Sequence, residues 1–278
     1  MKLYSFSLVF LGLTFQGHGS TSKIIRDLSK YRDPRELFGV TPLVPSLGST
    51  LKIVGGQEVV PNSYPFVVAL FVDGLYFCGG SILSDNRILT AAHCVDGRTY
   101  IEVVAGAHNV QQDEPDQEVV ATLDYTVHEN WNFNITSGFD VAVVKLNKPL
   151  VLNDKVGTIS RAQADPTIGE KTTAIGWGKP RDSAPGISAT LNYVDGLPVI
   201  SDEECSLIYG PLSPATLCVS SEGGHGTCSG DSGGPLINVN SELVGITSFT
   251  SGEGCELGFP DGFTSVADFN IWIDANLE

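Results

Sequence analysis

The chain has 278 residues, of which 42% are hydrophobic, 16 are Lys or Arg and 32 are Asp or Glu. This composition is typical of a globular protein with a buried core and excludes a disordered or fibrous chain. Residues 1–52 carry seven basic and three acidic side chains, which leaves nine basic against 29 acidic side chains in the rest. Because so acidic a surface repels nucleic acid and anionic lipid, we expect neither as a partner.

The first 19 residues have the pattern of a secretory signal peptide. Lys2 precedes an apolar run from Leu3 to Phe15, and the small residues Gly17 and Gly19 follow it. The run is too short to cross a bilayer, and the small residues suit a cleavage site. We therefore expect residues 1–19 to be removed and the product to be secreted and extracellular.

Residues 20–52 form a segment of different character, which we call the prosegment. It is basic, has no cysteine, and ends in a stretch rich in Pro, Gly and Ser that is typical of a linker. Ile24, Ile25 and Leu28 are spaced for a short amphipathic helix before Pro34. A spacer without fixed structure is the alternative.

From Ile53 onward, short apolar runs alternate with Gly, Pro, Asn and Asp. These runs are of strand length and rich in β-branched and aromatic residues, which predicts an antiparallel all-β domain. They are PFVVALFV, YIEVVAGA, EVVATLDYTV, DVAVVKL, TLNYVDGLPVI and ELVGITSF. The end of the chain differs, because Phe269, Trp272 and Ile273 share one face of a predicted helix.

Six cysteines fit an exported protein. An even number in such a chain favours disulfides, and sequence alone permits fifteen pairings. The spacings lack the Cys-x-x-Cys or His-x-x-x-His pairs that a structural zinc site requires.

The stretch HGTCSGDSGGP, residues 225–235, places Ser232 among glycines. A serine nucleophile needs a base, an orienting partner for that base, and donors aimed at the developing oxyanion. The G-x-S-x-G pattern also matches the nucleophile elbow of α/β-hydrolases, but that fold needs a histidine after the serine. The last histidine is His225, so this alternative fails and the base must lie upstream.

Two upstream residues suit these roles. His93 lies in LTAAHC, a strand-like segment next to a cysteine, and Asp140 opens the apolar run DVAVVKL. Together with GWG at 176–178 and GDSGGP, these motifs resemble the chymotrypsin-fold (trypsin-like) serine peptidases, and are most similar to the brachyurin-type crustacean collagenases and arthropod digestive proteases. The resemblance runs from the IVGG at 53 to the final helix. It implies a peptidase domain over 53–278 with two antiparallel six-stranded Greek-key β-barrels, the site between them, and a C-terminal α-helix.

The resemblance assigns a role to each residue of the site. It implies that His93 is general base and acid, that Asp140 orients it, and that Ser232 is the nucleophile. The backbone N–H groups of Gly230 and Ser232 would form the oxyanion hole. Cleavage after Lys52 would activate the zymogen by freeing the amine of Ile53 to pair with Asp231.

The resemblance also implies how the cysteines pair. The pairs would be Cys78 with Cys94, Cys205 with Cys218, and Cys228 with Cys255. No cysteine would hold the prosegment on the enzyme after cleavage. The chain also lacks a cysteine-rich regulatory module, which favours a digestive protease over a member of a cascade.

The specificity pocket combines conflicting features. Trypsins carry aspartate six residues before the serine, where this chain has Gly226, but Asp261 matches a pocket-wall segment. Brachyurin-type enzymes with that arrangement cleave broadly, whereas Thr250, in place of a glycine, should narrow the entrance as bulky residues do in elastases. Mixed, large apolar and small apolar preferences therefore stay open. The predicted pocket residues are Gly226, Thr227, Ser248, Phe249, Thr250 and Asp261, and Ser248–Thr250 should pair with substrate as an antiparallel strand.

The remaining motifs are weaker. QQDEPDQE at 111–118 lies where trypsins hold calcium, but Ala107 replaces the first glutamate, so we expect a solvated acidic loop with no metal and no cofactor, and bound calcium is the alternative. Asn134 begins a glycosylation sequon before Asp140. We expect a monomer whose partners are protein or peptide substrates, an activating protease and protein inhibitors. A regulatory protease with a narrow substrate and an inactive binding homologue are the alternative functions.

Overall fold

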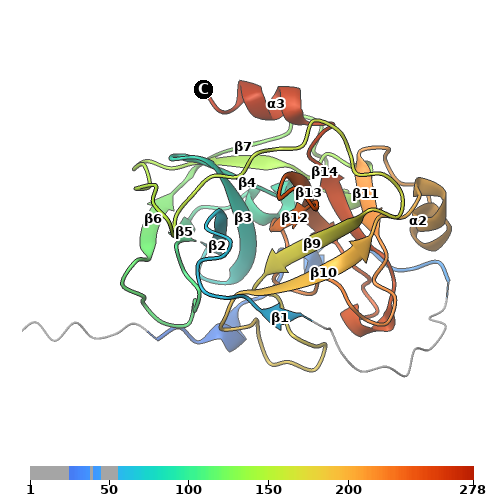
Figure 1. Ribbon diagram of the computed structural model, residues 1–278, viewed down its shortest axis with the longest axis horizontal. Coiled ribbons are helices and arrows are strands. Elements are labelled where there is room, and N and C mark those ends of the chain that lie inside the picture. Colours follow the sequence, from blue (N-terminus) through green and yellow to red (C-terminus); the bar gives the residue numbers. More distant parts are fainter. Residues whose placement is uncertain (1–24, 38–39, 45–55) are drawn as a thin grey trace, which may run out of the picture.

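The computed structural model describes residues 25–37, 40–44 and 56–278. The predicted signal peptide and the bond after Lys52 lie outside the described residues. Over the described residues the strands form two antiparallel sheets of seven strands, each curled on itself, and the two lie side by side (Figure 1). This arrangement confirms the predicted pair of antiparallel barrels, although each sheet has seven strands where six were expected.

The first sheet comes from residues 67–145 and has the strand order β6-β5-β2-β3-β4-β8-β7. Its strands are β2 (Val67–Val72), β3 (Tyr76–Ser84), β4 (Arg87–Thr90), β5 (Ile101–Ala105), β6 (Glu118–Thr122), β7 (Asp124–Val127) and β8 (Ala142–Lys145). The run at 118–127 was expected as one strand, but it breaks where Thr122 donates to the carbonyl of Lys145 and accepts from the N–H of Asp124. The break lets β6 pair with β5 and β7 pair with β8.

The second sheet has the order β1-β10-β9-β12-β13-β14-β11. Its strands are β1 (Gln57–Glu58), β9 (Lys171–Gly176), β10 (Asn192–Pro198), β11 (Thr216–Val219), β12 (Pro235–Ile237), β13 (Leu243–Phe249) and β14 (Asp261–Ser265). β1 is a short edge strand that extends β10, so the chain just after the predicted cleavage point is held against this sheet.

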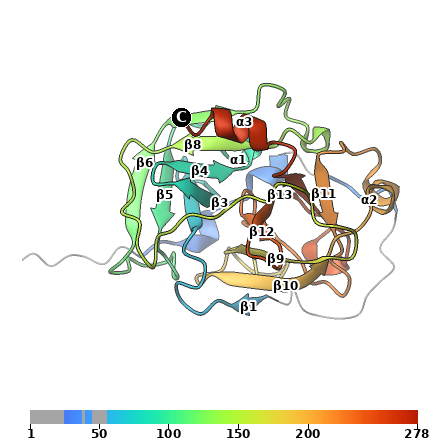
Figure 2. The ribbon, with the colours of Figure 1, turned by 45° about the horizontal axis from the view of Figure 1, so that its top comes forward.

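The described residues form three short α-helices. They are α1 (Ala92–Val95), α2 (Asp202–Tyr209) and α3 (Asn270–Ala275), and the 3₁₀ helices span Leu28–Lys30, Pro34–Leu37, Ile135–Ser137 and Cys255–Leu257. α3 lies against the outside of the first sheet, above it in Figure 1 and in front in Figure 2. Phe269 and Ile273 are buried and Trp272 packs on His128, which confirms the predicted helix face. No described helix is long and apolar enough to cross a membrane.

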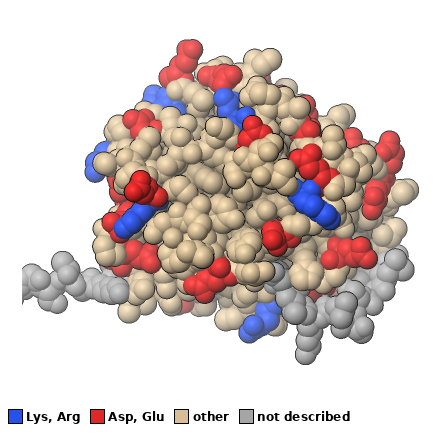
Figure 3. Space-filling model, viewed as in Figure 1, with Lys and Arg blue, Asp and Glu red and all other residues tan. Residues whose placement is uncertain are grey.

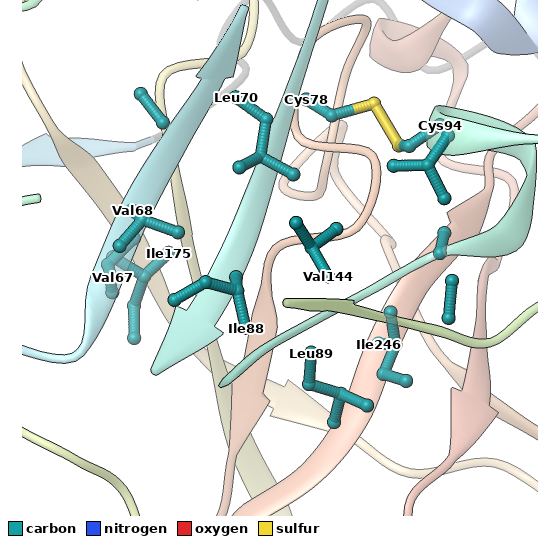
Figure 4. Packing of buried hydrophobic residues seen from close by; sticks show 14 of the residues in the cluster. Val67, Val68, Leu70, Cys78, Ile88, Leu89, Cys94, Val144, Ile175 and Ile246 are labelled. Atoms are coloured by element: carbon teal, nitrogen blue, oxygen red, sulfur yellow. A yellow bond between two sulfur atoms is a disulfide. The ribbon is translucent and has the colours of Figure 1, made fainter. Parts of the chain in front are cut away.

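Buried aliphatic residues of both sheets pack into one cluster. Figure 4 shows Leu70, Ile88 and Val144 of the first sheet with Ile175 and Ile246 of the second. The disulfide Cys78–Cys94 lies at the edge of this cluster and ties β3 to α1. The shared core fixes one barrel against the other, and therefore fixes residues that the two barrels contribute to one site.

All three predicted disulfides are present. They join Cys78 to Cys94, Cys205 to Cys218, and Cys228 to Cys255. Each bridge between distant parts of the chain stabilises the fold mainly by restricting the unfolded chain, by about 2–4 kcal/mol.

The described part of the prosegment is folded onto the domain, so the prediction of a spacer without fixed structure is wrong there. Leu28 and Tyr31 are buried, and the Tyr31 ring lies 4.9 Å from that of Phe71 on β2. The predicted amphipathic helix is reduced to the single 3₁₀ turn Leu28–Lys30, capped by the side chain of Asp27. The blue segment in Figures 1 and 2 runs along both barrels.

Candidate active site

His93 and Asp140 form a buried, fixed pair. His93 Nδ1 lies 2.7 Å from Asp140 Oδ2, and the His93 N–H donates to Asp140 Oδ1 at 2.9 Å. Ser248 Oγ also donates to Asp140 Oδ2, at 2.6 Å. Three donors therefore satisfy a carboxylate that is fully buried, and Nε2 is the imidazole nitrogen left for proton transfer.

His93, Asp140 and the supporting Ser248 come from three different parts of the fold. His93 lies on α1, directly after β4, so its predicted placement on a strand is wrong. Asp140 precedes β8, which pairs with β4, and Ser248 belongs to β13 of the other sheet. Ser248 was predicted to line the specificity pocket, but its hydroxyl is directed at Asp140.

Ser232 lies in a tight loop of the second sheet. Its carbonyl accepts from the N–H of Gly79 on β3 at 2.7 Å, which docks the loop against the first sheet. Gly230 has a φ of +102°, and a Cβ there would lie 2.6 Å from Ile187 Cγ2, so only glycine fits. This conformation directs the N–H of Gly230 into the site.

A prosegment carboxylate occupies the site beside Ser232. Gly230 N–H donates to Asp33 Oδ2 at 2.8 Å, and Ser232 Oγ lies 3.1 Å from Asp33 Oδ1. Burial alone would raise the pKa of Asp33, but the charge and hydrogen bond of Arg35 and the charge of His93 hold that pKa below its ordinary value. Asp33 is therefore an anion held between Gly230 N–H and Ser232 Oγ, and it is a site residue that the sequence did not reveal.

Asp231 lies in a pocket lined by Gly56, Gly176 and Gly178. Its carboxylate accepts from Gly178 N–H at 2.8 Å and from Cys228 N–H at 2.9 Å. Burial raises the pKa of Asp231 to about 6, because the two backbone hydrogen bonds and the nearby charge of Arg35 compensate only in part. Its predicted partner Ile53 lies outside the described residues.

The predicted pocket residues Gly226, Thr227 and Asp261 converge. Thr227 N–H donates to Asp261 Oδ2 at 2.6 Å, and any side chain at Gly226 would collide with the Asp261 carboxylate. Burial raises the pKa of Asp261, and hydrogen bonds from Thr250 and Thr227 oppose this only partly. Asp261 thus lies within reach of the pocket floor, and Thr250 lies beside it.

The cleft in front of this pocket is lined by both the domain and the prosegment. Thr250, Phe249 and Ile135 line it together with Arg35 and Val40. Phe249 is itself buried, with its ring 5.3 Å from that of Tyr209. The sequon residue Asn134 precedes Ile135 and is exposed, so a glycan there would lie beside the cleft.

Potential metal ligands converge at two places in the described part of the chain. These are Cys78, His93 and Cys94, and Asp182, Cys228 and Cys255. All four cysteines are in disulfides and cannot supply the thiolate that binds a metal. In the acidic loop at 111–118, Glu114 instead accepts from the N–H of His108.

Two curled antiparallel sheets, with a serine and a buried Asp–His pair between them, are the architecture of a chymotrypsin-like serine endopeptidase. The sequence model of the trypsin family, described as Trypsin, matches residues 53–273. The chain belongs to this family and is a serine-type endopeptidase whose substrates are proteins.

The chain is 49% identical over 221 residues to brachyurin of Leptuca pugilator, covering 80% of this chain and 96% of that protein. It is 36% identical to cationic trypsin-3 of Rattus norvegicus (80% and 88% covered) and 34% identical to trypsin of Sus scrofa (81% and 96% covered). Among solved structures, neuropsin, a serine protease expressed in the limbic system of mouse brain, superposes with a TM-score of 0.72 at 29% identity, covering 81% of this chain and 99% of that one.

Proposed function

We propose that the chain is a secreted zymogen that hydrolyses peptide bonds through an acyl-enzyme formed on Ser232. His93 Nε2 takes the proton of Ser232 Oγ as that oxygen attacks the substrate carbonyl, and Asp140 stabilises the imidazolium. The N–H groups of Gly230 and Ser232 hold the oxyanion. His93 then protonates the leaving amine, and water hydrolyses the acyl-enzyme by the same steps in reverse.

One observation carries this assignment. A carboxylate oxygen of Asp33 lies 2.8 Å from Gly230 N, and the other lies 3.1 Å from Ser232 Oγ. Donors at that distance from an anionic oxygen are what an oxyanion hole requires. The same anion lies close enough to His93 for the imidazolium charge to lower its pKa. Ser232 Oγ and Gly230 N–H therefore both contact one anion, on which the charge of His93 also acts, and this supports the proposed roles.

Activation would follow cleavage after Lys52. Gly56 lines the pocket around Asp231. Ile53 precedes Gly56 by three residues, and three residues of extended chain span about 10 Å. The free amine would enter this pocket and pair with the buried carboxylate of Asp231, whose burial the nearby charge of Arg35 offsets only in part. Secretion is supported by the signal-like N-terminus and by the three disulfides.

For specificity we propose a mixed pocket that accepts basic as well as apolar side chains. Asp261 supplies a buried negative charge near Gly226, and a substrate cation there would gain a charge-assisted hydrogen bond. The similarity to brachyurin supports this assignment. Thr250 remains the residue that would restrict the entrance, and a preference for small apolar side chains would show that it does.

Labelling by an organophosphate tests the proposed chemistry. The zymogen is cleaved after Lys52, the new Ile53 terminus is confirmed, and the site of modification is mapped by mass spectrometry. We expect modification at Ser232, and none in the control Ser232→Ala. A folded, correctly processed protein that has been freed of its prosegment and still resists the reagent would refute the proposal.

A cleavage profile tests the pocket. Peptides that differ only in the residue before the scissile bond are compared for the processed enzyme and for Asp261→Asn, which keeps an acceptor for Thr227 N–H but removes the charge. We expect cleavage after Arg, Lys, Leu and Phe, with only the basic activity lost in the variant. Cleavage confined to Ala, Val or Leu would show that Thr250 controls the entrance.

A further inference from the structure

The first half of the prosegment binds along the first sheet. Arg26 N–H donates to the carbonyl of Gln111 at 2.8 Å, and its guanidinium pairs with Glu102 at 2.9 Å. Further along, Arg32 donates to Leu75 O at 2.9 Å and accepts from Phe77 N–H at 3.0 Å, an arrangement that pairs it in parallel with Tyr76. Backbone pairing therefore holds the prosegment up to the residue before Asp33.

The middle of the prosegment covers the reacting groups. Asp33, Pro34 and Arg35 are all buried, and so are Ser232 and His93 beneath them. Arg35 binds Asp33 through its backbone N–H and its guanidinium, and also donates to the carbonyl of Cys228 at 2.8 Å. That guanidinium lies near enough to Asp231 and Asp261 for their charges to raise its pKa. The pair thus fills the oxyanion position and the mouth of the specificity pocket together.

The second half of the prosegment binds along the second sheet. Val40 pairs in parallel with Ser251 and accepts from Gly252 N–H at 2.9 Å, and Leu43 N–H donates to Ile208 O at 2.6 Å. In the described residues the last of these contacts is that of Leu43, nine residues before Lys52 in the sequence. They do not depend on the bond that activation breaks.

The prosegment crosses the cleft in the direction opposite to a substrate. A substrate strand is expected to pair antiparallel with Ser248–Thr250, whereas Val40 runs parallel to the continuation of that edge at Ser251. The prosegment residues after Asp33 consequently lie on the side of Ser232 where a substrate would place the residues before its scissile bond. The group presented to Ser232 is a side-chain carboxylate rather than a peptide carbonyl. A carboxylate has no amine leaving group, so the enzyme cannot acylate itself on it.

Charge complements this fit. The prosegment, residues 20–52, carries six basic and three acidic side chains, and residues 53–278 carry nine basic and 29 acidic ones. Figure 3 shows acidic side chains spread over one face of the molecule. Opposite net charges favour association, and the effect weakens as salt is added.

We propose that residues 25–44, after cleavage at Lys52, act as a reversible inhibitor that binds the mature enzyme across its active site in reverse, with Asp33 in the oxyanion hole and Arg35 at the pocket mouth. The inhibitory part of this proposal rests on the proposed function, but the binding does not. Activation then has two steps, cleavage and release. A mature enzyme at high concentration remains partly inhibited by its own released prosegment.

The test uses a synthetic peptide of residues 25–44 and the processed enzyme freed of its own prosegment. Three peptides are compared: the natural one, Asp33→Asn, and the matched control Asp27→Asn. Asp27 is exposed, and among the described residues its side chain bonds only to Ser29 of the prosegment. We expect competitive inhibition with equal Ki for the natural and control peptides. Asp33→Asn should raise Ki by about 30- to 300-fold, because it leaves Arg35 without its anion. All three peptides should remain intact by mass spectrometry.

Three outcomes would overturn the proposal. They are cleavage of the natural peptide between residues 31 and 37, an unchanged Ki for Asp33→Asn, and no inhibition at about 1 mM peptide. A fluorescently labelled peptide, followed by anisotropy on the same protein, separates this proposal from the proposed function. The processed protein could lack activity and still bind the natural peptide, with the binding abolished by Asp33→Asn. That result would refute the proposed function and support the inference.

Hydrogen exchange of the uncleaved zymogen gives an independent intramolecular test. Because Gly230 N–H donates to Asp33, its exchange should be slow, and Asp33→Asn should speed it by at least about tenfold while Asp27→Asn leaves it unchanged. Equal exchange of the Gly230 amide in all three zymogens would contradict the contact on which the proposal depends.

Discussion

Asp261 shows how burial determines the chemistry of a single residue. Its side chain is buried and its pKa is raised, so it takes up a proton under milder acid than an ordinary aspartate. The protonated form has no charge to pair with a substrate cation. Selectivity for basic side chains should therefore depend on pH even though His93 serves every substrate.

The ratio of kcat/KM for an Arg peptide to that for a Leu peptide should fall as the pH is lowered, and should begin to fall at a higher pH than an ordinary aspartate would give. The protonation of His93 affects both substrates alike and cancels in the ratio. Steady-state kinetics on matched peptides measures this ratio of kcat/KM values. Asp261→Asn is the control, for which the ratio should be low and independent of pH. A constant ratio in the natural enzyme would show that Asp261 does not contact the substrate cation.

Asp231 should make the zymogen less stable as the pH rises. Burial raises its pKa to about 6, whereas the unfolded chain releases that proton near pH 4. The folded state therefore binds more protons between these values, so the stabilisation is complete below about pH 4 and is lost as the pH rises through about 6. The loss amounts to about 3 kcal/mol.

Urea unfolding of the uncleaved zymogen measures this contribution. Other carboxylates change the free energy of unfolding in the opposite direction as the pH rises. The natural zymogen is therefore compared with Asp231→Asn at each pH. The difference in free energy of unfolding between the two proteins should shift by about 3 kcal/mol between about pH 4 and pH 7. A difference that does not change with pH would contradict the raised pKa.

At the scale of elements, α3 was predicted from its apolar face and the strands from their short apolar runs. The sequence could not show where the run at 118–127 breaks, because the break depends on Lys145 of another strand. It also could not show that His93 lies on a helical turn, since α1 has only four residues and its sequence is as apolar as that of the neighbouring strand. Local patterns predict elements with a long periodic face and fail for single turns.

The two isoleucines of α3 give a matched pair for its packing. Ile273 is fully buried and Ile271 is 88% exposed. Ile273→Ala should lower the free energy of unfolding by about 2–4 kcal/mol, through lost burial and a cavity, whereas Ile271→Ala should change it by less than about 0.5 kcal/mol. Chemical denaturation with intact disulfides measures both. Equal effects would mean that α3 does not pack on the barrel through this face.

At the scale of the whole molecule, activation depends on a chain end reaching the interior. The proposed pair of the Ile53 amine with Asp231 requires a protonated amine, whose ordinary pKa is near 8 and rises beside a carboxylate. Activity of the mature enzyme should therefore fall as the pH rises above about 9, with loss of reactivity toward organophosphates as well.

A pH profile of kcat/KM, repeated after acetylation of the Ile53 amine, tests that pair. Acetylation should abolish the activity, and the uncleaved zymogen, which has no such amine, is the reference. An acetylated enzyme that keeps full activity would show that the amine is not needed, whatever the alkaline profile.

The sequence by itself determined the all-β class and the C-terminal helix, and it predicted the chemistry of Ser232 and the residues proposed to serve it. These follow from local patterns and from motifs whose order along the chain is specific. Only the tertiary structure decided that Ser248 supports Asp140, that Asp261 is buried beside Gly226, and that Asp33 and Arg35 cover the site. Asp33 lies 199 residues from Ser232 in the chain, and no local pattern encodes a contact that exists only because two barrels and the prosegment pack together.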